Sequence, residues 1–397
     1  MESESSSNKI LIAIVVVLVV CVGALISWMA FSDTSDTSVS EEIELNDSSD
    51  DSDTDELVYD GDAPVYVTVY SHNESSWEYV VNTEEKYFQY REELIERAEV
   101  LNEYGIEWNW QTDQPVVEAM VKHEDQEGEN VLEYLQTLGV HLDPHAHKNN
   151  YADIVYLMEE ELGVTATGVI GGLIHVECGR EHLNFLDFVS WHDQIELQSD
   201  GYVHGSDYPD ARWKPTILSD PGMGGHYFDD YSSGVWRPGD EDDFYTDFPD
   251  SDIVYIGEGY PHDVTIIGEH HSSGAKVFAE DGTYIKELVA KIKRGELPTG
   301  TKDGSQFMYT ASVHMRDKGT VTEGGGSVDT AAGIAQFMDE MQVLRGAGDV
   351  VFVDFEEAVR IWEEEYDSVP HYMNMESFSF YDDLEEEAFD YCKSTRK

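Results

Sequence analysis

The segment GVHLDPHAHKNN carries three histidines and an aspartate, at His141, Asp143, His145 and His147. Neutral imidazole is the commonest protein ligand for transition metals, and carboxylates complete many such sites. Proline is rare inside a central strand, so we expect the chain to turn at Pro144. A helical turn that begins there brings His141 close to His145, and an extended chain places both on one face. The spacing therefore predicts a divalent metal site that includes His141 and His145.

Titratable side chains also follow other predicted strands. His72 ends the first strand and Glu74 comes directly after it, while Asp113 ends the second. Two later strands run into His175 and His314. Active sites of α/β barrels form where strands end and loops begin, so these residues together predict a metal or acid–base site.

The elements that must position these residues alternate along the chain from Pro64 to about Val369. Apolar, β-branched segments alternate with amphipathic helical patterns, several of which end at a glycine. The expected strands are 65–72, 106–113, the histidine segment, 167–174, 213–218, 252–257, 308–314 and 350–355, and the expected helices are 84–104, 130–138, 151–162, 183–191, 282–293, 330–344 and 356–366. This alternation predicts one α/β domain at 64–369, followed by an acidic C-terminal tail at 370–397.

The N-terminal part of the chain has a different composition from the predicted domain. Residues 10–31 are uncharged and apolar, and as a helix they extend over about 33 Å, enough to cross a bilayer. Lys9 precedes this run and acidic residues follow it, which predicts a cytoplasmic segment 1–9 and an extracellular main domain. A cleaved signal peptide is the alternative, but the run is long and has no clear cleavage site. Residues 32–63 are rich in Ser, Asp and Thr, which predicts a disordered acidic stalk behind a single-pass membrane anchor.

The charge balance limits the classes of partner. The chain has 83 Asp and Glu residues against 23 Lys and Arg, a formal net charge of −60. The acidic residues are spread over the whole sequence, which is typical of proteins that fold in high salt. Phosphate binding requires clustered cations, so nucleic acid is excluded as a partner. The three cysteines do not form a disulfide framework, and Cys178 and Cys392 are left either to pair or to stay free.

The middle of the chain, 198–252, is rich in Gly, Asp, Tyr and Trp and predicts a long excursion over one face of the domain. Aromatic faces stack on sugar rings, so this region is a candidate wall for a carbohydrate, although loop packing explains the same aromatics equally well. The candidate substrate-binding residues are His147, His175, Arg212, His226, Trp236 and Arg237.

Three motifs carry a resemblance to a known family. His141-Leu-Asp-Pro-His145 matches in spacing the second motif of polysaccharide deacetylases, the NodB-homology group. The segment from Arg212 to Pro215 resembles the Arg-x-Pro motif of that group, with one extra residue, and Ser312-Val-His314 resembles its late-strand histidine. This group belongs to the glycoside hydrolase/deacetylase superfamily. The resemblance implies a distorted seven-stranded (β/α) barrel behind the transmembrane helix.

The resemblance also implies metal-assisted hydrolysis of carbohydrate. His141 and His145 would hold a divalent metal, most simply Zn²⁺, with His72 or Glu74 as a further ligand. The implied general base is Asp113 or Glu74, and the implied general acid is His314.

The family pattern is not fully kept at the first motif, where paired aspartates are replaced by His72-Asn73-Glu74. Three functions therefore stay open. The leading one is a surface-anchored N- or O-deacetylase of polysaccharide, the second is a zinc-dependent glycoside hydrolase, and the third is a non-catalytic, carbohydrate-binding or structural cell-surface protein.

Overall fold

The structure is a computed structural model, and it describes residues 56–73, 83–124, 130–146, 150–171, 197–219, 232–239, 246–258, 282–316 and 331–374. The predicted cytoplasmic segment and membrane anchor lie outside these residues, as do most of the stalk and of the C-terminal tail. Within the described ranges, no helix combines the length and the hydropathy that a membrane span requires.

The central strand of the domain is β2 (Val65–Asn73), which is buried along its whole length. On one side β12 (Tyr309–Arg316) pairs with it in parallel. On the other side β13 (Val350–Phe352) pairs with its first half and β3 (Trp108–Thr112) with its second half, and β4 (Val140–Pro144) continues the parallel sheet beyond β3. Continuous burial and β-branched or aromatic residues are typical of strands covered on both faces.

A second five-stranded sheet has the order β14-β9-β10-β8-β5. Its strands are β5 (Val169–Ile170), β8 (Ile217–Leu218), β9 (Ser232–Trp236), β10 (Val254–Glu258) and β14 (Met373–Asn374). The two sheets meet at both ends. A bridge between His145 and Gly171 links β4 to β5, and the Thr310 hydroxyl of β12 donates to Gly257 O of β10 at 2.6 Å.

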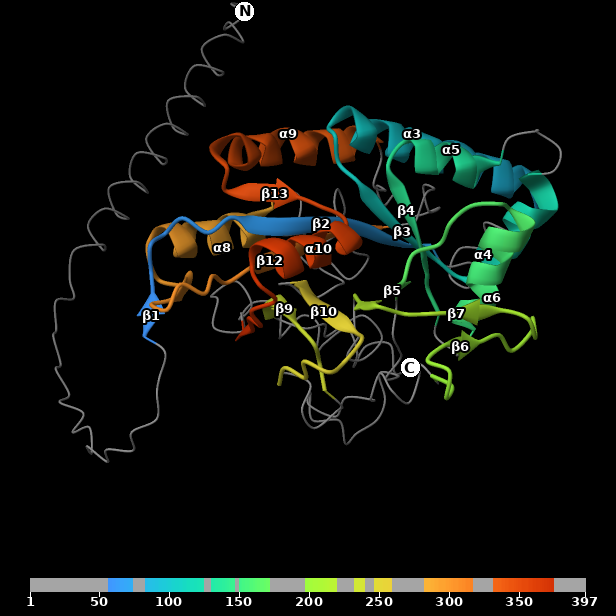
Figure 1. The fold of residues 1–397 in the computed structure, drawn as a ribbon. Helices are drawn as coiled ribbons and strands as arrows, with labels where there is room; N and C mark the ends of the chain where they lie inside the picture. Colours follow the sequence, from blue (N-terminus) through green and yellow to red (C-terminus); the bar gives the residue numbers. More distant parts are fainter. Residues whose placement is uncertain are drawn as a thin grey trace, which may run out of the picture. The chain divides into compact units, whose positions relative to one another are not determined.

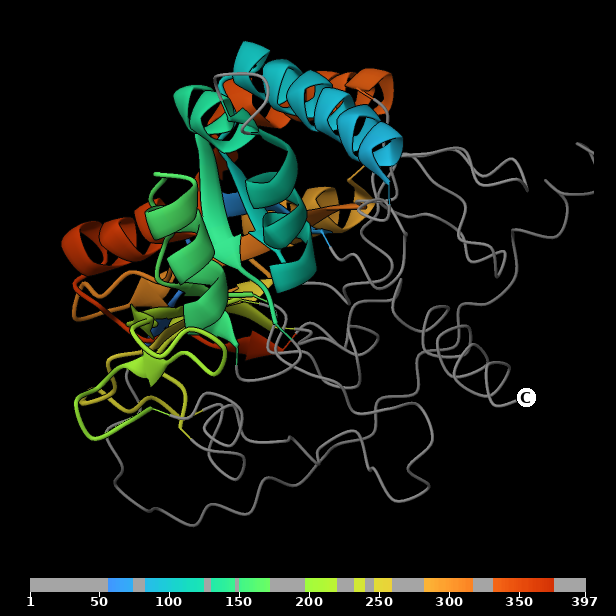
Figure 2. The same cartoon turned by 90° about the vertical axis from the view of Figure 1, so that its right-hand side faces the viewer.

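Helices cover the outer side of the first sheet (Figure 1). α3 packs against α5 and α9, and these two lie over β4 and β13 respectively. α4 follows β3 and α6 follows β4 along the chain, and these two helices contact each other (Figure 2). The helices are α3 (Glu84–Glu103), α4 (Gln114–His123), α5 (Val131–Thr137), α6 (Tyr151–Tyr156) with the π-helical turn η2 (Leu157–Glu161), α8 (Thr283–Lys293), α9 (Ala331–Ala347) and α10 (Phe355–Glu365). Two short pairs complete the fold, β1 (Leu57–Val58) with β11 (Gly300–Thr301) and β6 (Val203–His204) with β7 (Arg212–Trp213).

The side chains of β2 alternate between two separate apolar clusters. Val65, Val67 and Val69 belong to the cluster under the outer helices. Tyr66 and Tyr70 belong to a second cluster, which also contains Phe355 and Trp362 of α10 and apolar residues of β8 and β10. Because α10 contacts strands of both sheets, it lies between them. The interior side of the first sheet is therefore the side that faces α10 and the second sheet.

The predicted α/β class is confirmed, but several predicted elements differ. The strand expected at 213–218 is divided between β7 and β8, and the one at 167–174 is reduced to Val169–Ile170 within the described residues. The helix expected near 183–191 lies outside the described residues. α4 was missed although its start has two clear signals. Asp113 is an N-cap residue and Pro115 lies in the first turn, and both favour a helix start.

A buried histidine makes the fold sensitive to acid. His371 stacks on Phe307, with ring centroids 4.4 Å apart, and burial lowers its pKa to about 4. The unfolded chain takes up this proton near pH 6.5 and the folded chain does not, so stability falls as pH drops from 6.5 toward 4. His371→Phe keeps the stacking, and we expect the variant to recover about 3 kcal/mol relative to the native chain at pH 4. Urea unfolding in high salt at pH 7 and pH 4 measures this difference, and an equal loss in both proteins contradicts it.

Candidate active site

Three histidines from different strands come together on the interior side of the first sheet. His72 is the last residue but one of β2, His314 lies on β12 in register with Tyr70, and His145 follows β4. The His72 ring centroid lies 4.2 Å from that of His145 and 5.1 Å from that of His314. All three side chains are buried, with exposed fractions of 8%, 1% and 5% for His72, His145 and His314. We call these three residues the histidine cluster.

The strand pattern explains why the histidine cluster forms. Strand side chains alternate between faces, so the outward Val69 and Val313 leave Tyr70, His72 and His314 on the interior face. The Tyr70 ring packs 5.0 Å from His314 and 5.4 Å from His72 and supports both. The strands are parallel, so their carboxyl ends gather at one edge, as in other α/β sites.

The chemistry of the cluster fits a metal ion. The neutral imidazole ring is the form that binds metal, and all three histidines are buried together. Two imidazoles on one tetrahedral Zn²⁺ have ring centroids about 5 Å apart, because the Zn–N bond is about 2 Å long. The observed separations of 4.2 and 5.1 Å are close to this value. His72 therefore lies beside both His145 and His314, while among the described residues the three candidate ligand atoms that all lie within 4.8 Å of one another belong to Glu107, His141 and Asp354.

The predicted pair of His141 and His145 does not converge, because the predicted turn at Pro144 is absent. β4 stays extended through Pro144, which pairs with Thr112 of β3. Four residues of extended chain separate the two Cα atoms by about 13 Å. The ladder tolerates Pro144 because on the β5 side it consists only of isolated bridges, and there Pro144 O accepts from Gly171 N at 3.2 Å.

His141 instead lies in an acidic group at the other end of β4. Its Nε2 is 3.6 Å from Asp354 Oδ2 and 3.9 Å from Glu107 Oε2, and its Nδ1 is 3.9 Å from Glu356 Oε2. Glu107, His141 and Asp354 each offer a ligand atom, all within 4.8 Å of one another, so they too could hold a metal ion. Burial raises the pKa of Glu107, and the neighbouring Asp354 carboxylate raises it further.

Asp354 also has a structural task, since its Oδ1 accepts from the backbone N–H groups of Glu356 and Glu357 and caps α10. Asp354→Ala removes this cap, and we expect it to lower the free energy of unfolding by about 0.5–2 kcal/mol. Asp354→Asn is the control, because its amide oxygen can still cap the helix. Thermal unfolding of both variants tests the assignment, and equal destabilisation would show that charge rather than capping is what matters.

Below the histidine cluster, the interior holds a polar network centred on Asp143. This fully buried carboxylate accepts from Thr167 Oγ1 at 2.6 Å, Asn109 Nδ2 at 3.0 Å and Gln111 Nε2 at 3.4 Å. Burial raises the pKa of Asp143 to about 8, although the three hydrogen bonds act to lower it. The prediction missed Asn109 and Gln111. Their alternation with Trp108 and Trp110 in the sequence WNWQT is the signal, since it places two amides on the face opposite two indoles.

The side chain of Asn73, in the first motif, is hydrogen-bonded to its own strand, to β3 and to Tyr90. Its Nδ2 donates to Ser71 O, Ser71 Oγ and Gln111 O, and its Oδ1 accepts from Tyr90 OH at 2.9 Å. The side chain therefore holds the ends of β2 and β3 together, on the side away from the histidine cluster. Of the His72-Asn73-Glu74 motif, His72 is the described residue that reaches the interior.

Asp113, a predicted base, has a structural contact as well. Its carboxylate accepts from Val116 N at 3.1 Å and caps α4. Its role as a base stays a prediction. Four further predicted site residues lie outside the described residues, namely Glu74, His147, His175 and His226.

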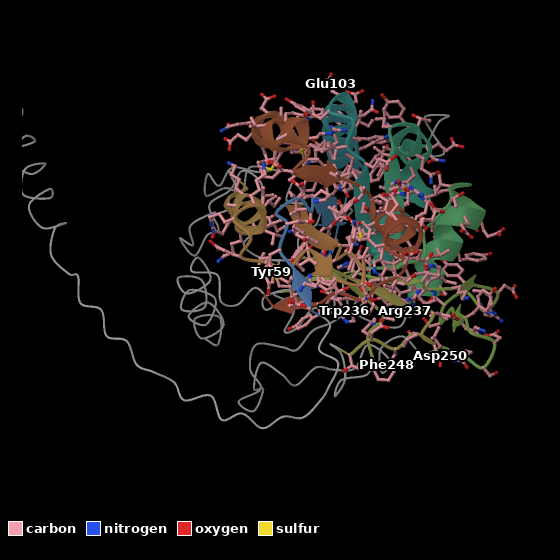
Figure 3. All side chains as sticks on the ribbon, turned by 60° about the vertical axis from the view of Figure 1, so that its left-hand side comes forward. Tyr59, Glu103, Trp236, Arg237, Phe248 and Asp250 are labelled. Carbon is pink, nitrogen blue, oxygen red and sulfur yellow. The ribbon has the colours of Figure 1, made fainter. Side chains whose placement is uncertain are left out.

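Trp236, a predicted substrate-binding residue, does not line a substrate-binding surface in the structure. This residue is 1% exposed and packs edge-on against Tyr255, with ring centroids 4.5 Å apart, so it belongs to the core and offers no face to a sugar. Arg237, its neighbour at the end of β9 (Figure 3), places its guanidinium carbon 4.6 Å from the Trp362 ring centroid of α10. Arg212 is exposed and donates from Nη1 to Pro209 O at 3.0 Å. Substrate binding by either arginine stays a prediction.

No family model matches the chain, and no curated protein matches it. Among solved structures, it is similar to a probable polysaccharide deacetylase from Pseudomonas aeruginosa PAO1, with 11% identity over 77% of this chain and 93% of the other and a TM-score of 0.43. It is also similar to an allantoinase, with 10% identity, 77% and 92% coverage and a TM-score of 0.43. A GH57 branching enzyme from Thermococcus kodakaraensis has 10% identity, 76% and 71% coverage and a TM-score of 0.35.

Polysaccharide deacetylases, which the sequence motifs resemble, are thus also among the similar structures. These identities and TM-scores are too low to assign a fold or a reaction to the chain.

Proposed function

We propose that the chain is a metal-dependent hydrolase of acylated carbohydrate, related in type to polysaccharide deacetylases and built on a distorted (β/α) barrel. The observation that carries the proposal is the convergence of His72, His145 and His314 from three strand ends, buried and with ring centroids 4.2 and 5.1 Å apart. Zinc is the metal we expect for a site of imidazole nitrogens.

The residues divide into ligands and proton-transfer groups. His72 and His145 would hold the ion, because their rings are the nearest pair. When bound, the ion supplies Lewis acidity, which polarises an acyl carbonyl and lowers the pKa of water. His314 would give a proton to the leaving group, as the family resemblance implies. Its position on the adjacent strand, with its ring 5.1 Å from that of His72, supports this role. Glu74 and Asp113 remain the candidate bases, and His147 and His175 candidate substrate contacts.

A zinc-dependent glycoside hydrolase is the second candidate. It is favoured by the first motif, where His72 replaces an aspartate and Asn73 is used by the fold. The two enzymes give different products from a partly acetylated glycan. We expect free acetate without new reducing ends. New reducing ends would favour the glycosidase, and stoichiometric metal with neither product would favour a non-catalytic, carbohydrate-binding surface protein.

We further propose that residues 10–31 anchor the protein in the cell membrane, with the N-terminus cytoplasmic and the α/β domain outside. The apolar, uncharged composition of this run supports the proposal. Protease treatment of intact cells should remove the domain and leave a short membrane-bound fragment. A domain that is fully protected from protease, or is released into the medium, contradicts this topology.

A further inference from the structure

The polar network under the histidine cluster contains one atom whose hydrogen bonding is incomplete. Gln111 is fully buried on β3, in register with His72 of β2 and Asp143 of β4. Its Oε1 is buried and has no hydrogen-bond partner within the described part of the chain. Leaving a buried carbonyl oxygen without a donor is costly, so such an atom in a native protein calls for an explanation.

The neighbours of Gln111 determine which way its amide points. Ser219 Oγ lies 3.2 Å from Ile170 O, and since a carbonyl oxygen can only accept, the single proton of the serine hydroxyl is donated to it. The serine hydroxyl therefore accepts from Gln111, and the amide atom 2.9 Å from it must be Nε2. Asp143 Oδ2 lies 3.4 Å from the same nitrogen. Both N–H groups of the Gln111 amide therefore donate to Ser219 and Asp143, and Oε1 is the amide atom that is left over.

The carbonyl oxygen lies next to the backbone that positions His145. Gly171 forms a bridge with His145, and a Cβ atom added at Gly171 would lie 2.6 Å from Gln111 Oε1. A glycine at this position therefore leaves room for the carbonyl. Gln111 is also in register with His72, so its side chain leaves the sheet on the same face as the His72 ring.

We propose that Gln111 is a specificity-determining residue whose Oε1 accepts a hydrogen bond from an N–H or O–H group of a glycan bound at the histidine cluster. This inference rests on the proposed function and adds to it a recognition role for a residue outside the predicted site. An acylamino group offers an N–H beside the acyl carbon, sugar hydroxyls offer O–H, and an ester oxygen offers no donor. A site that hydrogen-bonds a donor rejects ligands that lack it far more strongly than an apolar site does.

The test replaces the acceptor and preserves the packing. Gln111→Met keeps the length and approximate volume of the side chain and removes the carbonyl. Gln136→Met makes the same change on α5, at a partly exposed glutamine whose amide donates to Thr165 O at 2.8 Å. Titration calorimetry on the full chain, with and without Zn²⁺, would use two probes, chitotetraose and O-acetylated xylotetraose. Metal content and melting temperature are measured on the same samples.

We expect Gln111→Met to weaken binding of at least one probe by about tenfold or more, with metal content nearly unchanged. The melting temperature should fall, because Asp143 and Ser219 lose the hydrogen bonds from Gln111 Nε2. Loss for chitotetraose alone identifies the N–H donor, and loss for both probes identifies a hydroxyl donor. Gln136→Met should change neither. If Gln111→Met fails to fold, Gln111→Asn withdraws the carbonyl by one methylene, and the same loss is expected.

Two results overturn the inference in distinguishable ways. Native protein that binds both probes, with variants that bind them equally well, removes the role of Gln111 and leaves the proposed function intact. Native protein that binds neither probe, even with metal present, overturns the proposed function and this inference together.

Discussion

Replacing His145 with alanine is expected to abolish stoichiometric binding of a divalent metal, whereas replacing His141 leaves the metal in place. The His145 ring lies 4.2 Å from the His72 ring in the buried interior, while His141 lies beside Asp354 and Glu107 at the other end of β4. Loss of an outer-shell partner already weakens metal binding about 10- to 100-fold, and loss of a ligand weakens it more. Metal analysis after exhaustive dialysis of the two variants in high salt measures the difference.

This pair of variants separates two candidate centres in one strand. If His141→Ala loses the ion and His145→Ala keeps it, the metal belongs to the group of Glu107, His141 and Asp354. If neither variant changes the metal content, both ligand assignments fail. His72→Ala provides an independent check, because it removes the other ring of the nearest pair and should reproduce the loss seen with His145→Ala.

Replacing His314 with alanine is expected to lower turnover of an acylated glycan by about 10²–10⁴-fold while the metal is retained. The reason is that the His314 ring, 5.1 Å from His72, can deliver a proton to the leaving group without itself being one of the nearest pair of ligands. The rate of acetate release as a function of pH, together with metal content, tests this assignment. A general acid must be protonated to act, so the alkaline limb of the rate profile should be absent from the variant.

A histidine away from the cluster provides the control for His314→Ala. His204→Ala removes a half-exposed histidine that pairs with Asp200 on the β6–β7 hairpin, and turnover should stay near the native value. Unchanged turnover in His314→Ala would rule out its role as general acid. Loss of metal in His314→Ala would instead make it a third nitrogen ligand.

Much of the α/β order could be predicted because several strands are rich in β-branched and aromatic residues and several helices end at a glycine. The histidine cluster could be predicted only in part. His72 and His314 stand at strand ends in the sequence, so their convergence follows from a parallel sheet. The sequence also predicts His72 as a ligand beside His145, but it pairs His141 with His145 as well, because proline statistics favour a turn at Pro144. The isolated bridges toward β5 allow an extended strand there instead.

The role of aromatic residues was the least predictable part of the site. Trp236 lies in a segment rich in glycine and aromatic residues, and local sequence cannot show that β9 buries it against Tyr255. The same limit applies to Gln111, whose function depends on Ser219 and Gly171, more than fifty residues away in the chain. Such contacts are set by the pairing of β3 with β4 and of β4 with β5.

Anomalous diffraction from crystals of the native protein, recorded on both sides of the zinc absorption edge, would locate the metal most directly. A single strong peak between the rings of His72 and His145 is the predicted result. A peak at Glu107, His141 and Asp354, or no peak in crystals grown with zinc, would contradict the central claim that the histidine cluster is the metal centre.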